Sequence, residues 1–385
     1  MQTFRKSLLN TYVVLTFFLL GSCYSSAAAR AAGPEVTADA AVLMDARTGT
    51  ILWGRAPYER RPPASTTKML TAIIALEKGR LTDVVTVSPS ASWTEGSSIY
   101  LQAGEKVTLE QLLWGALLES GNDACVAIAE YLAGGEDAFA QLQNRKARAI
   151  GAWDTHFVNP HGLSDPDHYS TAYDLASIAR YALKNKKFQE IVRAREKVVG
   201  GPTGPRSFFS TNRLLWSYSG ADGVKTGTTS DAGQCLVASA TREGRQLVAA
   251  LLHSDDRWSD AASLLEFGYT ESRLLQPGKA GEMVDLPVKG GLEATIPARL
   301  EKDLYLVVPR QKVGQVEKAL EVKTLKAPIE HGCKVGEVVI KLDGEVVGRT
   351  SLIATRAVAA KNAATVFLWK VFFPLLKEMK YLRLL

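Results

Sequence analysis

The sequence predicts an α+β domain, in which helices flank a five-stranded antiparallel sheet, followed by a small all-β domain. Three observations predict this fold class. Apolar runs with the strand pattern occur near the N-terminus and again after residue 223, and helical periodicity dominates the chain between them. Beyond residue 276 helical periodicity largely disappears, and short β runs replace it. The 385 residues are enough for two domains with filled cores.

Five strands are expected in the first domain. Residues 40–54 contain two short apolar runs around a glycine-containing turn, which is the pattern of a β-hairpin. Three further runs lie at 224–228, 234–240 and 246–252, and a Glu-Gly turn joins the last two. Strands linked by hairpins are antiparallel, so these runs and the N-terminal hairpin predict one antiparallel sheet.

Helical spacing predicts the elements between these strands. One helix should begin at Ser65 and end at Lys78, because a glycine follows. A second should be capped by Thr108 and break at the polar turn 119–123, where a third begins. A short polar turn between two apolar helices is suited to presenting side chains to a cleft. Further expectations are helices at 124–132, 136–150 and 172–183, an irregular loop at 158–163, Trp114 in the core and Asp123 as a helix cap.

The chain is expected to divide into four parts. The clearest hairpin signal of the second domain is the Asp343-Gly344 dipeptide between two apolar runs. The expected parts are a signal peptide at 1–32, the α+β domain at 33–275, the β-rich domain at 276–355 and an amphipathic tail at 356–385.

The N-terminus has the layout of a secretory signal. Two basic residues precede the apolar run 11–21, and Ala-x-Ala cleavage options follow near Ala29 and Ala31. The run is too short for a confident membrane span. The Leu-Gly-Ser-Cys stretch that ends at Cys23 leaves lipoprotein processing open, in which case Cys23 would carry lipid. Either route predicts a mature chain outside the cytoplasm, associated with the membrane or the cell wall.

The net charge of +6 comes from the two ends of the chain. The first 30 residues carry three basic and no acidic residues, and residues 356–385 carry six basic residues and one glutamate, so the part between them is slightly acidic. On a helical wheel the charged residues of the tail fall on one side, and Pro374 should kink it. This pattern predicts a helix lying in the bilayer interface, with packing on the protein itself as the alternative. A nucleic-acid partner is not expected.

Cysteine and histidine usage predicts neither a disulfide framework nor a cofactor. Cys125 and Cys235 lie in apolar segments and are expected to be buried free thiols, and Cys333 leaves an odd number after removal of the signal. The five histidines show no paired metal-ligand spacing, so no metal site is expected.

Three short motifs carry the chemistry. In Ser65-Thr-Thr-Lys68 the lysine returns to the same helix face one turn after the serine, and the helix N-terminus favours an anion forming there. Alone, this motif is more often a capping serine and a surface lysine. It is followed in order by Ser120-Gly121-Asn122 between two helices and by Lys225-Thr226-Gly227 on a predicted strand.

The three motifs, in this order and context, resemble the active-site set of penicillin-binding proteins and serine β-lactamases. The longer runs 64–72, 119–124, 159–163 and 222–227 resemble the low-molecular-mass D-alanyl-D-alanine carboxypeptidases, serine peptidase family S11. The resemblance extends from about residue 35 to the C-terminus. It implies a β-lactamase/transpeptidase-like fold, removal of the terminal D-alanine from peptidoglycan pentapeptides and covalent inhibition by β-lactam antibiotics.

Residue roles follow from the chemistry and from the resemblance. Ser65 is the candidate nucleophile, and Lys68 is the candidate base, which requires burial and a neighbouring cation to lower the pKa of the lysine. By resemblance, Ser120 passes the proton to the leaving D-alanine. Asn122 orients the acyl side chain and Lys68.

The substrate-binding set rests mainly on the resemblance. Lys225 would supply the second positive charge and, with the Thr226 hydroxyl, hold the substrate carboxylate; Gly227 completes this motif. Thr228 would form the oxyanion hole with Ser65 through main-chain N–H groups. Arg257 resembles a family arginine near the carboxylate site.

Several alternatives stay open at this point. A serine β-lactamase shares the three motifs, although no stretch resembles the glutamate loop that one such class uses for deacylation. A D,D-endopeptidase would use the same chemistry on crosslinks, and an inactive peptidoglycan-binding scaffold would normally lack the serine or the lysine. His161 could be a general base, but its Pro/Gly-rich loop favours a structural role.

Overall fold

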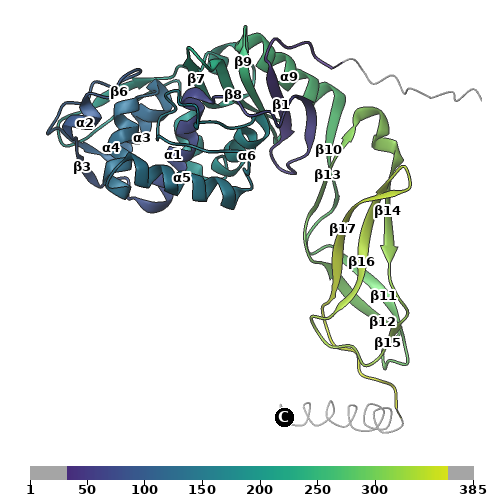
Figure 1. Ribbon diagram of the computed structural model, residues 1–385. Helices are drawn as coiled ribbons and strands as arrows, with labels where there is room; N and C mark the ends of the chain where they lie inside the picture. The colour runs from purple at the N-terminus through teal and green to yellow at the C-terminus, as the bar shows by residue number, and fades with distance from the viewer. Residues whose placement is uncertain (1–32, 363–385) are drawn as a thin grey trace, which may run out of the picture. The chain divides into compact units, whose positions relative to one another are not determined.

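The computed structural model describes residues 33–362 (Figure 1). The predicted signal peptide, Cys23 and most of the predicted amphipathic tail lie outside the described residues. Within the described range, no helix has the length and apolar character needed to cross a membrane.

The first domain is organised around a five-stranded antiparallel sheet in the order β2-β1-β9-β8-β7. This confirms the predicted fold class. The central pairing joins the N-terminal hairpin to the C-terminal strands, because Ala40–Asp45 runs antiparallel to Arg245–Ser254. The strands are β1 Ala40–Asp45, β2 Ile51–Arg55, β7 Ala221–Thr229, β8 Gly233–Arg242 and β9 Arg245–Ser254.

Helices cover both faces of this sheet (Figure 1). The helix α9, Arg257–Glu271, packs on one face through Ala261, Leu264 and Leu265. Helix α8, Leu214–Ser217, contributes Leu214 to the same core as α9, and the remaining helices enclose the larger core on the other face. Their bounds are α1 Lys68–Lys78, α2 Pro89–Ser92, α3 Leu109–Trp114, α4 Asn122–Ala133, α5 Glu136–Ile150, α6 Ala172–Ala182 and α7 Lys186–Val192. Two short hairpins pair β3 Val84–Thr86 with β4 Lys106–Thr108, and β5 Glu196–Val199 with β6 Arg206–Phe209.

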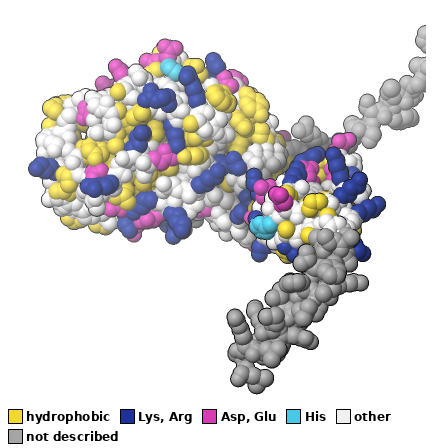
Figure 2. Space-filling view, turned by 90° about the horizontal axis from the view of Figure 1, so that it is seen from below, with side chains coloured by type: hydrophobic (Ala, Val, Ile, Leu, Met, Phe, Trp, Pro, Cys, Tyr) yellow, Lys and Arg dark blue, Asp and Glu magenta, His cyan; other side chains and the backbone are white. Residues whose placement is uncertain are grey.

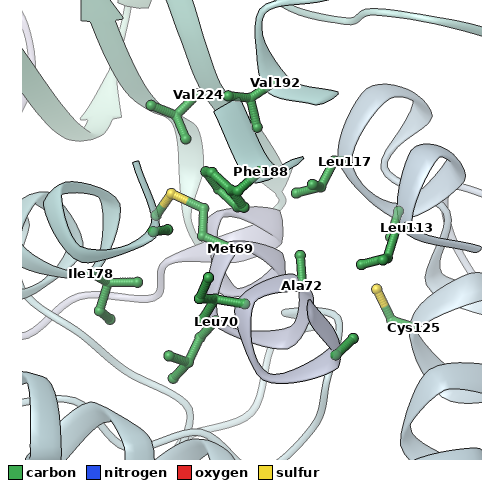
Figure 3. Packing of buried hydrophobic residues seen from close by; sticks show 14 of the residues in the cluster. Met69, Leu70, Ala72, Leu113, Leu117, Cys125, Ile178, Phe188, Val192 and Val224 are labelled. Atoms are coloured by element: carbon green, nitrogen blue, oxygen red, sulfur yellow. The ribbon is translucent and has the colours of Figure 1, made fainter. Parts of the chain in front are cut away.

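Helix α1 lies at the centre of the larger core. Its first eight residues are buried, and Figure 3 shows Met69, Leu70 and Ala72 surrounded by apolar side chains from α3, α6 and α7. The predicted end at Lys78 is confirmed. The first turn is tighter than predicted: a 3₁₀ turn, η1, spans Ala64–Thr67, so the α-helix proper begins at Lys68.

The predicted break between two apolar helices is also confirmed. Thr108 forms a capping box with Gln111 at the start of α3, and a π-helical turn, η2, follows at Gly115–Glu119. Ser120 then adopts a left-handed conformation, with φ of 67°, before α4 begins. Trp114 is buried in the core as predicted.

Asp123 is predicted to cap the helix that follows it; the N-cap residue of α4 is Gly121, but the Asp123 carboxylate accepts the Ala124 N–H of the first turn at 2.8 Å. Asp123 is the second residue of α4, and its carboxylate accepts hydrogen bonds from the backbone N–H groups of Ile99 and Leu101 at 3.1 Å and from the Ser98 hydroxyl at 2.7 Å. These partners lie more than 20 positions away, so local pattern could not reveal them. These hydrogen bonds to the Asp123 carboxylate connect the loop that follows α2 to the start of α4.

The β-rich part has its own sheet and core. Six strands pair in the order β14-β16-β17-β12-β11-β15, and apolar residues such as Ile296, Leu300 and Val338 fill the core beneath them. The hairpin predicted at Asp343-Gly344 joins β16 to β17, which confirms it. The elements are β10 Ser272–Gly278, β11 Met283–Lys289, β12 Thr295–Leu300, β13 Leu304–Pro309, η3 Arg310–Gln315, β14 Val316–Glu321, β15 Leu325–Lys326, β16 Lys334–Leu342 and β17 Glu345–Ala354. The boundary expected at 275/276 falls within β10 and stays a prediction.

A buried ion pair ties β1 to β9. Asp45 is fully buried and accepts from Arg245 Nε at 2.9 Å, while Nη1 donates to the carbonyl groups of Gly268 and Ser272 and Nη2 to the Ser272 hydroxyl. We expect Asp45→Asn to lower the free energy of unfolding by about 3 kcal/mol, because Arg245 keeps a buried charge without its counterion. Urea denaturation followed by circular dichroism measures this loss. The matched control is Asp154→Asn in the exposed pair with Arg60, which should cost far less; equal losses in the two variants would contradict the prediction.

Candidate active site

Ser65 lies in a tight turn held by its own neighbours. The Thr66 hydroxyl donates to the Pro63 carbonyl at 2.7 Å, and the Thr67 hydroxyl donates to the Ala64 carbonyl at 2.9 Å. Ala64 is in the left-handed region with φ of 48°, which is uncommon for alanine. These bonds hold Ser65, the half-buried residue of the turn, in one orientation at the start of α1.

Lys68 is fully buried and directs its amine at Ser65. Its Nζ lies 2.7 Å from Ser65 Oγ, 2.7 Å from Asn122 Oδ1 and 2.7 Å from the His161 carbonyl oxygen. An ammonium has three donors, so these acceptors satisfy all of them. Burial lowers the pKa of Lys68 to about 8. The neutral amine can donate to two of the acceptors and direct its lone pair at the serine hydroxyl.

Asn122 is held by hydrogen bonds from its side-chain amide and from its backbone N–H. Its Nδ2 donates to the Glu95 carbonyl at 2.6 Å, and its backbone N–H donates to the Ser97 carbonyl at 2.7 Å. The amide oxygen therefore faces Lys68. Ser120, buried and left-handed, lies two residues earlier on the same turn. The Ser120-Gly121-Asn122 motif is therefore connected to the Ser65–Lys68 motif through the hydrogen bond between Asn122 and Lys68.

Strand β7 brings the third motif against the serine turn. It lies at the edge of the five-stranded sheet. A Cβ added at Gly227 would come within 2.9 Å of the Ser65 backbone nitrogen and 3.1 Å of the Pro63 carbonyl oxygen. Only a glycine lets the strand pass this close to the turn. Thr226 is buried and shares a hydrogen bond of 2.7 Å with the Thr211 hydroxyl, whereas Thr228 is exposed.

Lys225 is the second buried lysine of the site. Its Nζ donates to the Thr226 carbonyl at 3.0 Å. Burial lowers the pKa of Lys225 well below its usual range, and the positive charges of Lys68 and Arg257 lower it further. The positive charge of Lys68 therefore opposes protonation of Lys225.

Arg257, the first residue of α9, braces the end of β7. Its Nη1 donates to the Gly227 carbonyl at 2.9 Å, to the Thr228 hydroxyl at 2.9 Å and to the Cys235 carbonyl at 3.2 Å. Burial lowers the pKa of this guanidinium. The predicted site arginine is thus next to the Lys-Thr-Gly strand, where it contacts main chain and a hydroxyl.

His161 contributes a backbone atom that sequence analysis missed. Its carbonyl accepts from Lys68, while its buried ring accepts from the Leu163 N–H through Nδ1 and lies 3.2 Å from Glu136 through Nε2. Burial lowers the pKa of the ring, which favours the neutral form. This geometry agrees with the structural role that the loop pattern favoured. The carbonyl contacts made by Glu95 and Ser97 were missed too, because any residue type can supply a carbonyl.

The predicted buried free thiols are confirmed. Cys125 and Cys235 are buried and unpaired, and Cys333 is unpaired and exposed. Burial raises the pKa of Cys125 to about 12, which keeps it protonated beside the site. Among residues 33–362 no group of histidine, cysteine and acidic side chains is arranged to hold a metal ion.

Gly227 offers a test of the close approach between β7 and the serine turn. We expect Gly227→Ala to slow acylation of Ser65 by about 10²-fold, because the added methyl group displaces the strand or the turn by a fraction of an ångström to an ångström. Labelling with a fluorescent penicillin measures the rate. The control is Gly200→Ala, where an added Cβ meets nothing within 4 Å. An unchanged rate in Gly227→Ala would contradict the steric argument.

A serine hydroxyl that is hydrogen-bonded to a buried lysine, beside an edge strand that carries Lys-Thr-Gly, is the arrangement of an enzyme with a serine nucleophile and a lysine base. Comparisons with known proteins narrow this class. A family model described as D-alanyl-D-alanine carboxypeptidase matches residues 27–256, and one described as penicillin-binding protein 5, C-terminal domain, matches residues 269–360. The chain therefore belongs to the D-alanyl-D-alanine carboxypeptidase family, serine peptidase family S11.

Individual relatives match most of the chain. D-alanyl-D-alanine carboxypeptidase DacF of Bacillus subtilis is 33% identical over 329 residues, covering 82% of this chain and 85% of that protein. DacA of Escherichia coli is 32% identical and covers 86% and 85%. The crystal structure of penicillin binding protein 5 from Haemophilus influenzae matches with a TM-score of 0.74 at 31% identity, over 85% of this chain and 98% of that one.

Proposed function

We propose that this chain removes the terminal D-alanine from peptidoglycan pentapeptide stems through an acyl-enzyme on Ser65. The single observation that carries the proposal is the 2.7 Å contact between Ser65 Oγ and the amine of the fully buried Lys68. A serine hydroxyl is inert without a base, and a lysine with a pKa of about 8 is neutral often enough near neutral pH to act as one.

In the first half-reaction Lys68 takes the proton of Ser65, and Oγ attacks the carbonyl carbon between the two D-alanines. The tetrahedral intermediate collapses when the C–N bond breaks, and the leaving amine receives a proton from Lys68 through the hydroxyl of Ser120. Asn122 holds Lys68 and the acyl chain. A water molecule then attacks the ester with the same base, which releases the shortened peptide and restores Ser65.

Residues of strand β7 bind the substrate. In this proposal Lys225 and the Thr226 hydroxyl hold the carboxylate of the terminal D-alanine, and that negative charge favours the protonated form of Lys225, leaving Lys68 as the base. Arg257 acts through the end of β7 that it braces. Main-chain N–H groups of Ser65 and Thr228 form the oxyanion hole, and each donor is worth about 3 kcal/mol.

Product analysis tests this function. Purified protein incubated with a pentapeptide muropeptide should release one D-alanine per stem, and penicillin should form a long-lived adduct on Ser65 visible by mass spectrometry. Folded protein that releases no D-alanine would contradict the proposal. Rapid turnover of penicillin would favour a β-lactamase, and cleavage of crosslinked dimers in place of D-alanine release would favour an endopeptidase.

The site is expected to work outside the cytoplasm, where peptidoglycan lies. We propose that residues 1–32 direct export, that the catalytic domain spans 33–275 and the β-rich domain 276–355, and that the tail 356–385 binds the membrane surface. Detergent-free washing of membranes from cells that express a chain truncated after residue 360 tests the tail. Release of the truncated protein supports the anchor, and retention without an N-terminal lipid contradicts it.

A further inference from the structure

The segment between β6 and α8 is held against the second motif through its backbone. The Thr211 N–H donates to the Leu118 carbonyl at 3.1 Å, and the Phe209 N–H donates to the Glu119 carboxylate at 3.1 Å. Both acceptors belong to η2, the π-helical turn that ends directly before Ser120. The position of this segment is therefore set by the element that leads to the second motif.

Side chains of the same segment contact strand β7. The buried Asn212 donates through Nδ2 to the Gly223 carbonyl at 2.9 Å. The neighbouring Thr211 places its hydroxyl 2.7 Å from the hydroxyl of Thr226, in the third motif. Thr211 thus binds η2 through its backbone and β7 through its side chain, although no step of the proposed reaction uses it.

The hydrogen bond between the two threonines has a direction that the substrate decides. A hydroxyl donates one hydrogen and accepts through its lone pairs, whereas a carboxylate only accepts. When Thr226 donates to a substrate carboxylate, its contact with Thr211 requires Thr211 Oγ1 to be the donor. Thr226 is only 6% exposed, so water has little access to replace this donor, while Thr211 lies on the exposed side of the pair.

Selection of a carboxylate depends on such local donors. Figure 2 shows basic and acidic side chains interspersed on one face of the molecule, and a surface of mixed sign produces a weaker long-range field than a surface of one sign. Within the site, Lys225 contributes positive charge, but a charge alone does not fix the orientation of a carboxylate. A directed hydroxyl donor does, because a hydrogen bond weakens steeply as its angle departs from linearity.

We propose that Thr211 is a positioning residue for recognition of the substrate carboxylate. By donating to Thr226 Oγ1, it leaves the hydrogen of Thr226 free to point at the carboxylate of the terminal D-alanine. Hydrogen bonds in a chain polarise one another, which also makes Thr226 the stronger donor. The inference rests on the proposed function, because it explains how Thr226 performs the role proposed there. Preference for a free C-terminal carboxylate is then the property that depends on Thr211.

Thr211→Val separates this role from a structural one. Valine keeps the β-branched shape and the backbone N–H that binds Leu118, and it removes only the hydroxyl. A residue that merely supported the segment would change the affinity for charged and uncharged ligands by similar factors. A residue that directs the Thr226 hydroxyl affects the charged ligand more. Thr211→Ser keeps a hydroxyl at the same position and should behave like the parent.

Calorimetry in the Ser65→Ala background measures this difference, because that variant leaves the substrate uncleaved. The two ligands are a pentapeptide with a free C-terminal carboxylate and the same peptide with a C-terminal amide. We expect the parent to bind the free acid about 100-fold more tightly, from the charge-assisted hydrogen bonds of Lys225 and Thr226. Adding Thr211→Val should lower this ratio about tenfold, whereas Thr211→Ser should keep it.

A double-mutant cycle with Thr226→Val shows whether Thr211 acts through Thr226. Thr226→Val should lower the ratio at least as much as Thr211→Val does, and adding Thr211→Val to it should cause no further loss. The control is Thr50→Val, which removes an exposed hydroxyl that pairs with the Thr48 hydroxyl at 2.9 Å between β1 and β2. This control should leave the ratio unchanged.

Three results would overturn the inference: equal affinities of the parent for acid and amide, a ratio unchanged by Thr211→Val, or effects of Thr211→Val and Thr226→Val that multiply in the double variant. Thermal melting followed by circular dichroism checks that each variant is folded, and Thr211→Ala replaces Thr211→Val should the latter not fold. D-Alanine release by the wild-type chain is measured separately. A chain that prefers the free acid without releasing D-alanine would contradict the proposed function and not the role of Thr211.

Discussion

Ser65→Ala should abolish both D-alanine release and labelling by penicillin. The variant removes the atom that forms the acyl-enzyme, and loss of a catalytic serine in enzymes of this chemistry costs about 10⁶-fold in turnover. Alanine keeps the turn, because the hydrogen bonds of Thr66 and Thr67 that hold it do not use the serine side chain. Pentapeptide binding should persist, which calorimetry can verify.

The matched control for this variant is Ser90→Ala, an exposed serine on α2. It should release D-alanine at the wild-type rate. Residual labelling of Ser65→Ala at a new site, or release of D-alanine above the uncatalysed rate, would mean that another nucleophile carries the reaction.

Lys68→Arg should slow acylation of Ser65 by about 10³-fold. Arginine stays protonated at all accessible pH values and cannot accept the serine proton, although it keeps the positive charge. In the wild-type chain the neutral fraction of Lys68 falls tenfold for each pH unit below a pKa of about 8. The acylation rate should therefore rise with pH up to about 8 and level off above it.

Rapid-mixing measurements with a chromogenic β-lactam between pH 6 and 10 provide both readouts. The Lys68→Arg variant should show a low rate with no rise through this range. A wild-type rate that does not depend on pH, or a variant that keeps the wild-type rate, would remove Lys68 from the role of base.

Much of the fold could be predicted because its signals are local. Strand and helix periods predicted the five-stranded sheet and the helices, and glycine marked the end of α1 at Lys78. The three motifs predicted which side chains meet, and the contacts of Lys68 with Ser65 and Asn122 agree with that. Each of these signals is carried by residue type and spacing, which a sequence records directly.

The rest depends on contacts between distant parts of the chain. Asp123 has the local signature of a cap and accepts the Ala124 N–H, but it also binds the distant N–H groups of Ile99 and Leu101. The carbonyl groups of Glu95 and His161 complete the surroundings of Asn122 and Lys68, and a carbonyl leaves no trace in residue identity. The left-handed backbone at Ser120 comes directly after a π-helical turn, and such a turn has no sequence period by which it could be predicted.

The burial of Lys68 lowers the stability of the folded domain. A lysine that titrates at about 8 when folded and at 10.5 when unfolded costs on the order of 3 kcal/mol of stability below pH 8, and this cost is relieved as the pH rises toward 10.5. Lys68→Met removes the charge but fills the same space. We expect this inactive variant to melt at a higher temperature than the active chain at pH 7, with the difference shrinking above pH 8. Catalysis and stability therefore place opposite demands on position 68: a substitution there that raises the melting temperature would remove the catalytic base.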